Sequence, residues 1–102
     1  MEDFQEIDAR QAKNIINQDD AIVIDIRDLA SFTEGHIPGA KQLTQEGIDS
    51  FVKETDKSTP LIFCCYHGFS SQQAAAYFVQ QGFQNVYSLK GGFEGWLNEY
   101  PS

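Results

Sequence analysis

The chain has 102 residues and a mass of 11.5 kDa, the size of a single domain. Its content of 41% apolar and 13% aromatic residues suffices for a packed core and excludes a disordered tail, and no apolar run reaches the about 20 residues of a membrane-spanning helix. Fifteen acidic against seven basic residues give a net charge of −8, which argues against a nucleic-acid-binding protein, because no basic stripe can neutralise phosphates.

The first half of the chain alternates between strand and helix patterns. Asp8, with Gln11 three residues later, forms a capping-box pattern before an amphipathic segment. The sequence AIVID is typical of a strand that is buried on both faces. The expected elements are strands at Phe4–Ile7, Ala21–Asp25 and Ala40–Leu43 and helices at Ala9–Gln18, Asp28–Glu34 and Thr44–Glu54, the last capped by Thr44.

The second half repeats this alternation. Leu61–Cys65 (LIFCC) is another fully apolar strand, and the helix after it is expected to be capped by Ser70 or Ser71 and ended by Gly82. The remaining expected elements are a strand at Asn85–Leu89, a turn at Gly91–Gly92 and a helix at Phe93–Tyr100.

The alternation of strands and helices predicts one α/β domain over residues 1–102, with a mainly parallel central sheet and helices on both faces. Ligands of such sheets bind at the carboxyl ends of the strands. Two strands lead into segments that carry chemistry: AIVID runs into Ile26-Arg27-Asp28, and LIFC runs into Cys65. We therefore expect the functional site at that edge of the sheet.

The candidate site is the loop Cys65-Tyr66-His67-Gly68-Phe69-Ser70-Ser71. If this loop curls, its backbone N–H groups converge on the Cys65 sulfur together with those of the following helix's first turn, and they form an anion cradle. The same dipoles lower the pKa of a cysteine below its usual value of about 8.5. Gly68 permits the positive φ or close backbone approach that a cradle needs. The pattern predicts that Cys65 is a nucleophile.

The other candidate ligands and nucleophiles in the chain have simpler interpretations. Cys64 lies inside the apolar run and is expected in the core. Adjacent cysteines on a strand point to opposite faces and the chain has no Cys-x-x-Cys, so we expect no disulfide, and no metal site with His36 and His67. We expect His67 to face solvent, a direct acid–base role being the alternative, and Phe69 either to wall the pocket or to pack on a neighbouring loop.

The charges are unevenly distributed along the chain. Residues 1–57 carry 13 acidic and 6 basic side chains, a net of −7, whereas residues 58–93 contain one charged side chain, Lys90. This stretch suits an anion-binding site, because no carboxylate in it would repel the ligand. Core formation explains the same pattern, and both explanations can hold.

Three segments together resemble the rhodanese (sulfurtransferase) superfamily. The first is Asp25-Ile26-Arg27-Asp28, followed by Phe32 and by Glu34-Gly35-His36-Ile37-Pro38-Gly39-Ala40, in which Glu34 departs slightly in position from the family's pattern. The second is the Cys65 loop, and the third is Gly91-Gly92-Phe93-Glu94-Gly95-Trp96. The match covers essentially the whole chain in the family's order. The short length, the Cys65 loop with its serine pair and the ending GGFEGW are most similar to the family's single-domain thiosulfate sulfurtransferases.

The resemblance implies a two-step reaction without a metal or organic cofactor. The Cys65 thiolate would attack the outer sulfur of thiosulfate, expel sulfite and become a persulfide, which an acceptor such as cyanide or a dithiol then discharges. A thioredoxin-like protein is one such dithiol. The backbone N–H groups of Tyr66, His67, Gly68, Phe69, Ser70 and Ser71 would hold the persulfide and the sulfonate oxygens. The resemblance further implies a supporting role for Arg27 in an internal polar network, a turn at His36, Pro38 and Gly39, and core positions for Phe93 and Trp96.

The loop departs from many loops of this family because it contains no Arg or Lys. Tyr66, Phe69 and Gln72 occupy the candidate positions, so backbone dipoles and Lys90 alone would oppose the field of a −8 protein. We therefore expect a high KM for thiosulfate, which leaves open a different physiological donor.

Two other functions compete with the sulfurtransferase. A phosphatase or arsenate reductase of related fold needs Cys-x5-Arg, and Ser71 stands at the arginine position. A non-catalytic or relay module, which binds a partner and carries or senses sulfur, stays open, although the presence of Cys65 favours an enzyme. The acidic surface is either solvated charge or a surface for a basic acceptor protein.

The start of the chain bears on location. Met1–Phe4 is acidic and lacks the basic and apolar regions of a secretory signal, so the cytoplasm is the expected compartment. A reducing compartment would also keep both cysteines as thiols.

Overall fold

The computed structural model describes residues 4–101, so Met1–Asp3 of the acidic N-terminus lie outside the described residues. The elements follow the expected order. The strands are β1 (Gln5–Ile7), β2 (Ile22–Asp25), β3 (Lys41–Gln42), β4 (Leu61–Cys64) and β5 (Val86–Leu89). The helices are α1 (Ala9–Asp19), α2 (Leu29–Glu34), the 3₁₀ helix η1 (Gln45–Gly47), α3 (Ile48–Glu54), α4 (Ser70–Gln80) and α5 (Gly92–Glu99).

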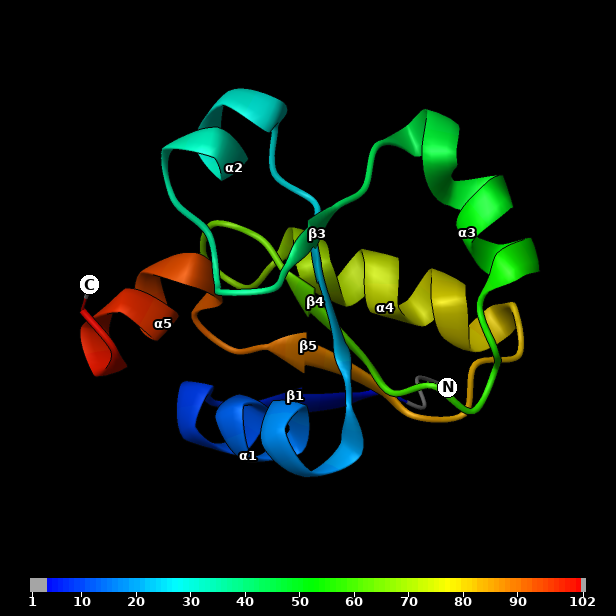
Figure 1. Ribbon diagram of the computed structural model, residues 1–102, viewed down its shortest axis with the longest axis horizontal. Coiled ribbons are helices and arrows are strands. Elements are labelled where there is room, and N and C mark those ends of the chain that lie inside the picture. The colour runs from blue at the N-terminus through cyan, green and yellow to red at the C-terminus, as the bar shows by residue number, and fades with distance from the viewer. Residues whose placement is uncertain (1–3, 102) are drawn as a thin grey trace.

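The five strands form one sheet in the order β1-β5-β4-β2-β3, and every neighbouring pair is parallel (Figure 1). The expectation of a mainly parallel central sheet is therefore confirmed. β4 lies in the middle of the sheet, where all four of its residues are buried. Its carboxyl end, between those of β2 and β5, is the position from which the Cys65 loop departs.

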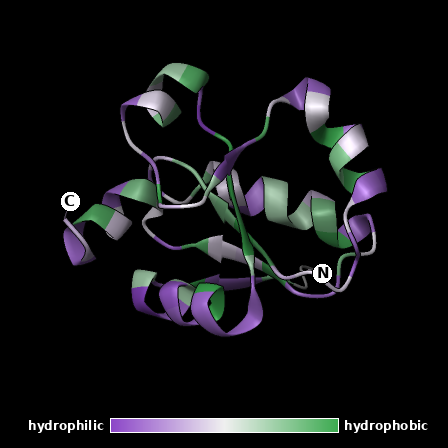
Figure 2. Ribbon diagram, viewed as in Figure 1, coloured by the Kyte–Doolittle hydropathy of each residue, from purple (hydrophilic) through white to green (hydrophobic). Residues whose placement is uncertain are grey.

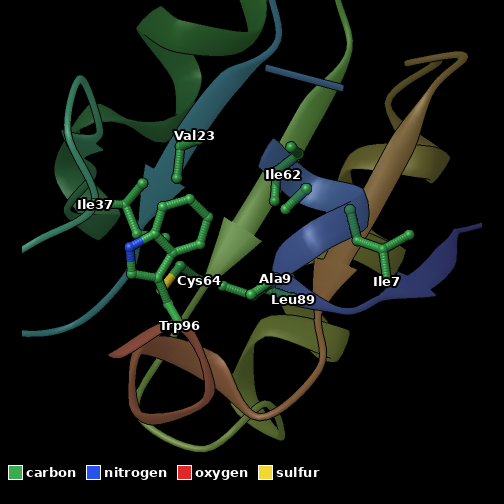
Figure 3. Packing of buried hydrophobic residues seen from close by; sticks show 9 residues of the cluster. Ile7, Ala9, Val23, Ile37, Ile62, Cys64, Leu89 and Trp96 are labelled. Atoms are coloured by element: carbon green, nitrogen blue, oxygen red, sulfur yellow. The ribbon is translucent and has the colours of Figure 1, made fainter. Parts of the chain in front are cut away.

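Helices cover both faces of the sheet, as expected (Figure 1). Alternate residues of β4 serve the two faces: Ile62 and Cys64 pack with α1 and α5, whereas Leu61 and Phe63 pack with α3 and α4. The first of these clusters is drawn in Figure 3, where Cys64 lies beside Trp96 of α5. Figure 2 shows the division of hydropathy, with apolar β2 and β4 inside and a largely hydrophilic α1 outside.

Of the two helix caps predicted in the first half of the chain, Asp8 is confirmed and Thr44 is wrong. The Asp8 capping box is present at α1, where Asp8 accepts from the Gln11 N–H and the Gln11 side chain accepts from the Asp8 N–H, both at 2.9 Å. Thr44, in contrast, makes no side-chain capping bond, and the segment after it begins as the 3₁₀ turn η1 before α3.

The end of β4 and the start of α5 each differ by one residue from the expected position, and both lie near the candidate site. β4 ends at Cys64, so Cys65 belongs to the loop rather than to the strand. α5 begins at Gly92 rather than at Phe93, because the expected Gly91–Gly92 turn supplies the N-cap and first residue of the helix. The turn before β3 is closed by a hydrogen bond from the Ala40 N–H to the Ile37 oxygen at 2.9 Å.

Candidate active site

The Cys65 sulfur is the focus of several hydrogen-bond donors. Cys65 is buried, with 4% of its surface exposed. The N–H groups of Gly68 and Ser71 point at the sulfur from 3.1 and 3.3 Å, and the Ser71 hydroxyl lies 3.4 Å away. The loop thus curls as the sequence predicts, and it directs backbone dipoles from two of its residues at one atom.

This geometry determines the ionisation of Cys65. Burial by itself would raise the pKa of the thiol, because a thiolate loses hydration. The hydroxyl and N–H of Ser71 and the N–H groups of Gly68 and His67 outweigh that effect, so the pKa of Cys65 lies below its ordinary value. Cys65 therefore has more thiolate character at neutral pH than an ordinary cysteine.

Gly68 is required by the close packing of the loop. Its φ is +95°, in the region that favours glycine, and a Cβ there would lie 2.8 Å from the Gly91 nitrogen. The expectation of positive φ and close approach at Gly68 is confirmed. The glycine allows the loop to rest on the segment between β5 and α5 while its N–H points inward at the sulfur.

The expected capping role of Ser70 or Ser71 is wrong. Phe69 is the N-cap of α4 and its side chain accepts no N–H. Ser71 is fully buried inside the first turn, where its hydroxyl faces the Cys65 sulfur and makes a 2.7 Å hydrogen bond to the Ser88 hydroxyl. The sulfur accepts the Ser71 N–H that a capping side chain would otherwise take.

Ser88 was missed by the sequence interpretation. It lies on β5 with no exposed surface, and its hydroxyl holds that of Ser71 beside the sulfur. The available signal was a serine within the apolar strand VYSL, since a buried hydroxyl needs a partner.

The other side chains of the loop are exposed, and two of them contact neighbouring segments. The His67 Nδ1 lies 3.5 Å from Glu94 Oε1, with both side chains more than 60% exposed, so His67 faces solvent as expected. Phe69 is 77% exposed, which does not fit packing on a neighbouring loop, and Ser70 is also exposed. Tyr66 is 46% exposed, and its hydroxyl donates to the Asp28 carboxylate.

The first turn of α5 supports the loop from below. The Phe93 N–H donates to the Cys65 oxygen at 2.8 Å, and the Glu94 N–H donates to the Tyr66 oxygen at 3.3 Å. Gly92 makes this contact possible, because a Cβ on it would lie 2.4 Å from the Cys65 oxygen. The glycine-rich segment before Trp96 thus acts as a platform for the loop, a role that the sequence interpretation did not assign.

Arg27 and Asp25 form a buried ion pair beside the site. The Arg27 Nη2 lies 2.7 Å from Asp25 Oδ2 and donates to the Gly35 oxygen at 2.7 Å, and the two side chains are 5% and 1% exposed. The internal polar network expected for Arg27 is therefore present. It joins the end of β2 to the segment after α2.

Asp28 caps α2 and holds Tyr66. Its carboxylate accepts hydrogen bonds from the Tyr66 hydroxyl and from the N–H and hydroxyl of Ser31. These bonds, that of Tyr66 first, lower the pKa of Asp28 to about 2. The carboxylate therefore remains ionised throughout the physiological range.

The remaining candidate groups lie outside the sulfur's environment. Burial, together with the nearby Asp25 carboxylate, raises the pKa of Cys64, which stays a thiol in the core. His36 stacks on Phe32 at 3.9 Å, and Lys90 lines a hollow with Asp8, Arg10 and Glu99.

Among residues 4–101, no three His, Cys, Asp or Glu side chains gather as a metal site would require. Within the same residues, no helix is both long enough and apolar enough to cross a bilayer.

The chain is similar to known proteins over nearly its whole length. The family profile described as Rhodanese-like domain matches residues 8–99. Two relatives are called Thiosulfate sulfurtransferase GlpE. The one from Stutzerimonas stutzeri (strain A1501) is 50% identical over 102 residues, which cover all of this chain and 93% of the relative. The one from Pseudomonas aeruginosa (strain LESB58) is 48% identical over 99 residues, which cover 97% of this chain and 89% of the relative. The solution structure of the Rhodanese-like domain of the Alr3790 protein from Anabaena superposes with a TM-score of 0.82 at 26% identity and covers 93% of this chain and 74% of that one.

Proposed function

This chain belongs to the rhodanese-like domain family, and we propose that it is a thiosulfate sulfurtransferase in which Cys65 carries the transferred sulfur. The observation that carries the proposal is the convergence of the Gly68 and Ser71 N–H groups and the Ser71 hydroxyl on one sulfur atom. The two N–H groups donate to the sulfur, and the hydroxyl can do so once Cys65 has lost its proton, so the three groups favour a thiolate before the reaction and a persulfide after it.

In the first step the Cys65 thiolate attacks the outer sulfur of thiosulfate. A bond forms between the two sulfurs, the sulfur–sulfur bond of thiosulfate breaks, and sulfite leaves with its electron pair. The unionised Cys65 donates a hydrogen bond to the Ser71 oxygen, and once the thiol has lost its proton the Ser71 hydroxyl can turn and donate to the sulfur instead. Ser88 can follow this turn, because either serine can act as the donor in their mutual hydrogen bond.

In the second step an acceptor removes the outer sulfur. A thiolate or cyanide attacks it, the bond to Cys65 breaks, and the Cys65 thiolate is restored as the leaving group. A dithiol, such as that of a thioredoxin-like protein, can complete the exchange by forming its own disulfide and releasing sulfide. Two free thiols in the chain suit a reducing compartment such as the cytoplasm.

The charge near the loop bears on the choice of donor. The loop contains no cation of its own, and Glu94 and Asp28 lie against His67 and Tyr66. A thiosulfate dianion therefore meets local repulsion as well as the −8 net charge, which supports the expectation of a high KM.

The test is thiocyanate formation from thiosulfate and cyanide by the wild type, Cys65→Ser and Cys64→Ser. We expect activity to be lost in Cys65→Ser and kept in Cys64→Ser, and the intact mass of the wild type to increase by one sulfur atom after thiosulfate alone. If the wild type gains no sulfur and forms no thiocyanate, the thiosulfate sulfurtransferase is refuted, and either another sulfur donor or the relay or binding module takes its place.

A further inference from the structure

A surface hollow of about 350 Å³ lies directly beside the Cys65 loop. Its walls include Arg27, Glu34, Tyr66, Phe93 and Leu97. Two of these residues connect it to the sulfur's loop, since Tyr66 follows Cys65 in the chain and the Phe93 N–H donates to the Cys65 oxygen at 2.8 Å. A molecule bound in the hollow would therefore lie next to the residue that carries the proposed persulfide.

Arg27 presents an unused donor in this hollow. Its side chain is 5% exposed, and its Nε and Nη2 bind Asp25 and the Gly35 oxygen. Nη1 has no hydrogen-bond partner among the described residues, whereas every fully buried side-chain nitrogen or oxygen in that part of the chain has one. Nη1 is therefore the part of the guanidinium that reaches the hollow.

The surroundings of Nη1 favour a neutral acceptor such as a peptide carbonyl. The Arg27 guanidinium is already paired with Asp25 at 2.7 Å, so little positive charge remains for an anion. The rings of Phe93 and Tyr66 lie 4.4 and 5.7 Å from its Cζ, and they make the walls of the hollow apolar. An N–H donor between apolar walls suits an extended peptide, whose carbonyl can accept the hydrogen bond while an apolar side chain packs on the walls.

The charges at the rim select the side chains of such a peptide. Glu34 lines the hollow and is exposed, and Glu94, whose side chain is 70% exposed, follows the lining residue Phe93 and lies against His67 of the loop. The rim therefore repels acidic segments and attracts basic ones. Leu97 lines the hollow with 37% of its surface exposed, and it adds apolar surface that a small thiol would leave uncovered.

We propose that the hollow docks a basic peptide segment of a protein whose cysteine exchanges sulfur with Cys65. A carbonyl of the segment accepts from Arg27 Nη1, an apolar side chain packs between Tyr66 and Leu97, and Lys or Arg side chains pair with Glu34 and Glu94. The inference rests on the proposed function for the chemistry: the partner's thiolate attacks the outer sulfur, the bond to Cys65 breaks, and the partner leaves as the persulfide.

Docking is tested first without sulfur transfer. The probe is a fluorescent peptide with a central serine in place of cysteine, flanked by Lys and Leu, and its counterpart in which Glu replaces Lys; anisotropy is measured at low salt. We expect the basic peptide to bind and the acidic one not to. The double variant Glu34→Lys/Glu94→Lys should weaken the basic peptide by roughly tenfold, whereas Glu46→Lys/Asp49→Lys, with the same change of net charge on another face, should not.

Transfer is tested next with the cysteine forms of both peptides and with cysteamine, a cationic thiol that has no backbone carbonyl. Each discharges the persulfidated wild type and both double variants, so differences in thiol reactivity cancel between proteins. The Glu34→Lys/Glu94→Lys variant should lose rate with the basic peptide and little with cysteamine. Equal losses for both thiols, or equal effects of the two double variants, would overturn docking in favour of a general field.

The two proposals fail in different ways. If thiosulfate leaves no sulfur on Cys65, the proposed reaction fails while the serine peptide still reports on docking. If the persulfide forms but basic and acidic peptides bind alike, the docking proposal is wrong and the reaction stands.

Discussion

The platform under the Cys65 loop predicts a specific defect in Gly92→Ala. Gly92 has a φ of +59°, and a Cβ on it would lie 2.4 Å from the Cys65 oxygen and 2.6 Å from the carbonyl carbon and oxygen of Tyr66. These atoms are backbone, so no side chain can rotate out of the way. The loop and the first turn of α5 must separate.

The cost has two parts. Alanine at positive φ loses roughly 1–2 kcal/mol, and forcing an extra methyl into a packed contact adds typically about 1–3 kcal/mol. The sum of roughly 2–5 kcal/mol is within the stability of about 5–15 kcal/mol that a domain of this size has, so the variant should fold. Separation would weaken the hydrogen bonds from Phe93 and Glu94 that fix the loop, and activity should fall further than stability.

Gly82→Ala is the matched control. Its φ of +99° is strained for alanine as well, but a Cβ there meets no atom within 4 Å. We expect Gly82→Ala to lose only the conformational part in urea unfolding and to keep its thiocyanate activity. If both variants lose equal stability and Gly92→Ala keeps full activity, the platform is not needed and the reasoning is refuted.

Three further predictions concern the loop's electrostatics. Because hydrogen bonds lower the pKa of Cys65, its thiolate persists at pH values where an ordinary cysteine is protonated; Ser71→Ala should move the midpoint of iodoacetamide alkylation against pH upwards, and an unmoved midpoint would exclude the hydroxyl. Phe69→Lys should lower the KM for thiosulfate at low salt, and an equal or higher KM would count against the electrostatic explanation. The Asp28 carboxyl should titrate at about 2 by NMR in the wild type and at higher pH in Tyr66→Phe, since the hydroxyl that stabilises the carboxylate is removed.

The fold could be predicted well from local sequence patterns, because the continuous apolar runs are also the segments that pack in the core. The continuous apolar runs AIVID and LIFC became the two inner strands β2 and β4, which must be apolar on both faces. The Asp8 capping box needs only residues three apart, so it could be predicted locally. The 3₁₀ start after Thr44 could not, because it depends on how the chain enters α3 after leaving the edge strand β3.

The contacts between distant segments could not be predicted from the sequence. The bond between Tyr66 and Asp28 joins residues 38 apart, and that between Ser71 and Ser88 joins residues 17 apart. Each depends on the strand order, which sequence periodicity does not specify. The free donor at Arg27 Nη1 could not be predicted either, because it is identified only once the structure shows that Asp25 and the Gly35 oxygen bind the other nitrogens of the guanidinium.

The wrong cap at α4 has the most informative cause. A serine pair before an apolar helix is a sound N-cap pattern, but a cap is needed only to accept free N–H groups. Here the Cys65 sulfur accepts the Ser71 N–H at 3.3 Å, and Ser71 turns its hydroxyl to the same atom. The start of α4 thus lacks a side-chain cap because the N–H of Ser71 stabilises the Cys65 thiolate instead. Ser71, the residue that departs from the capping pattern, therefore lies where the chemistry is proposed.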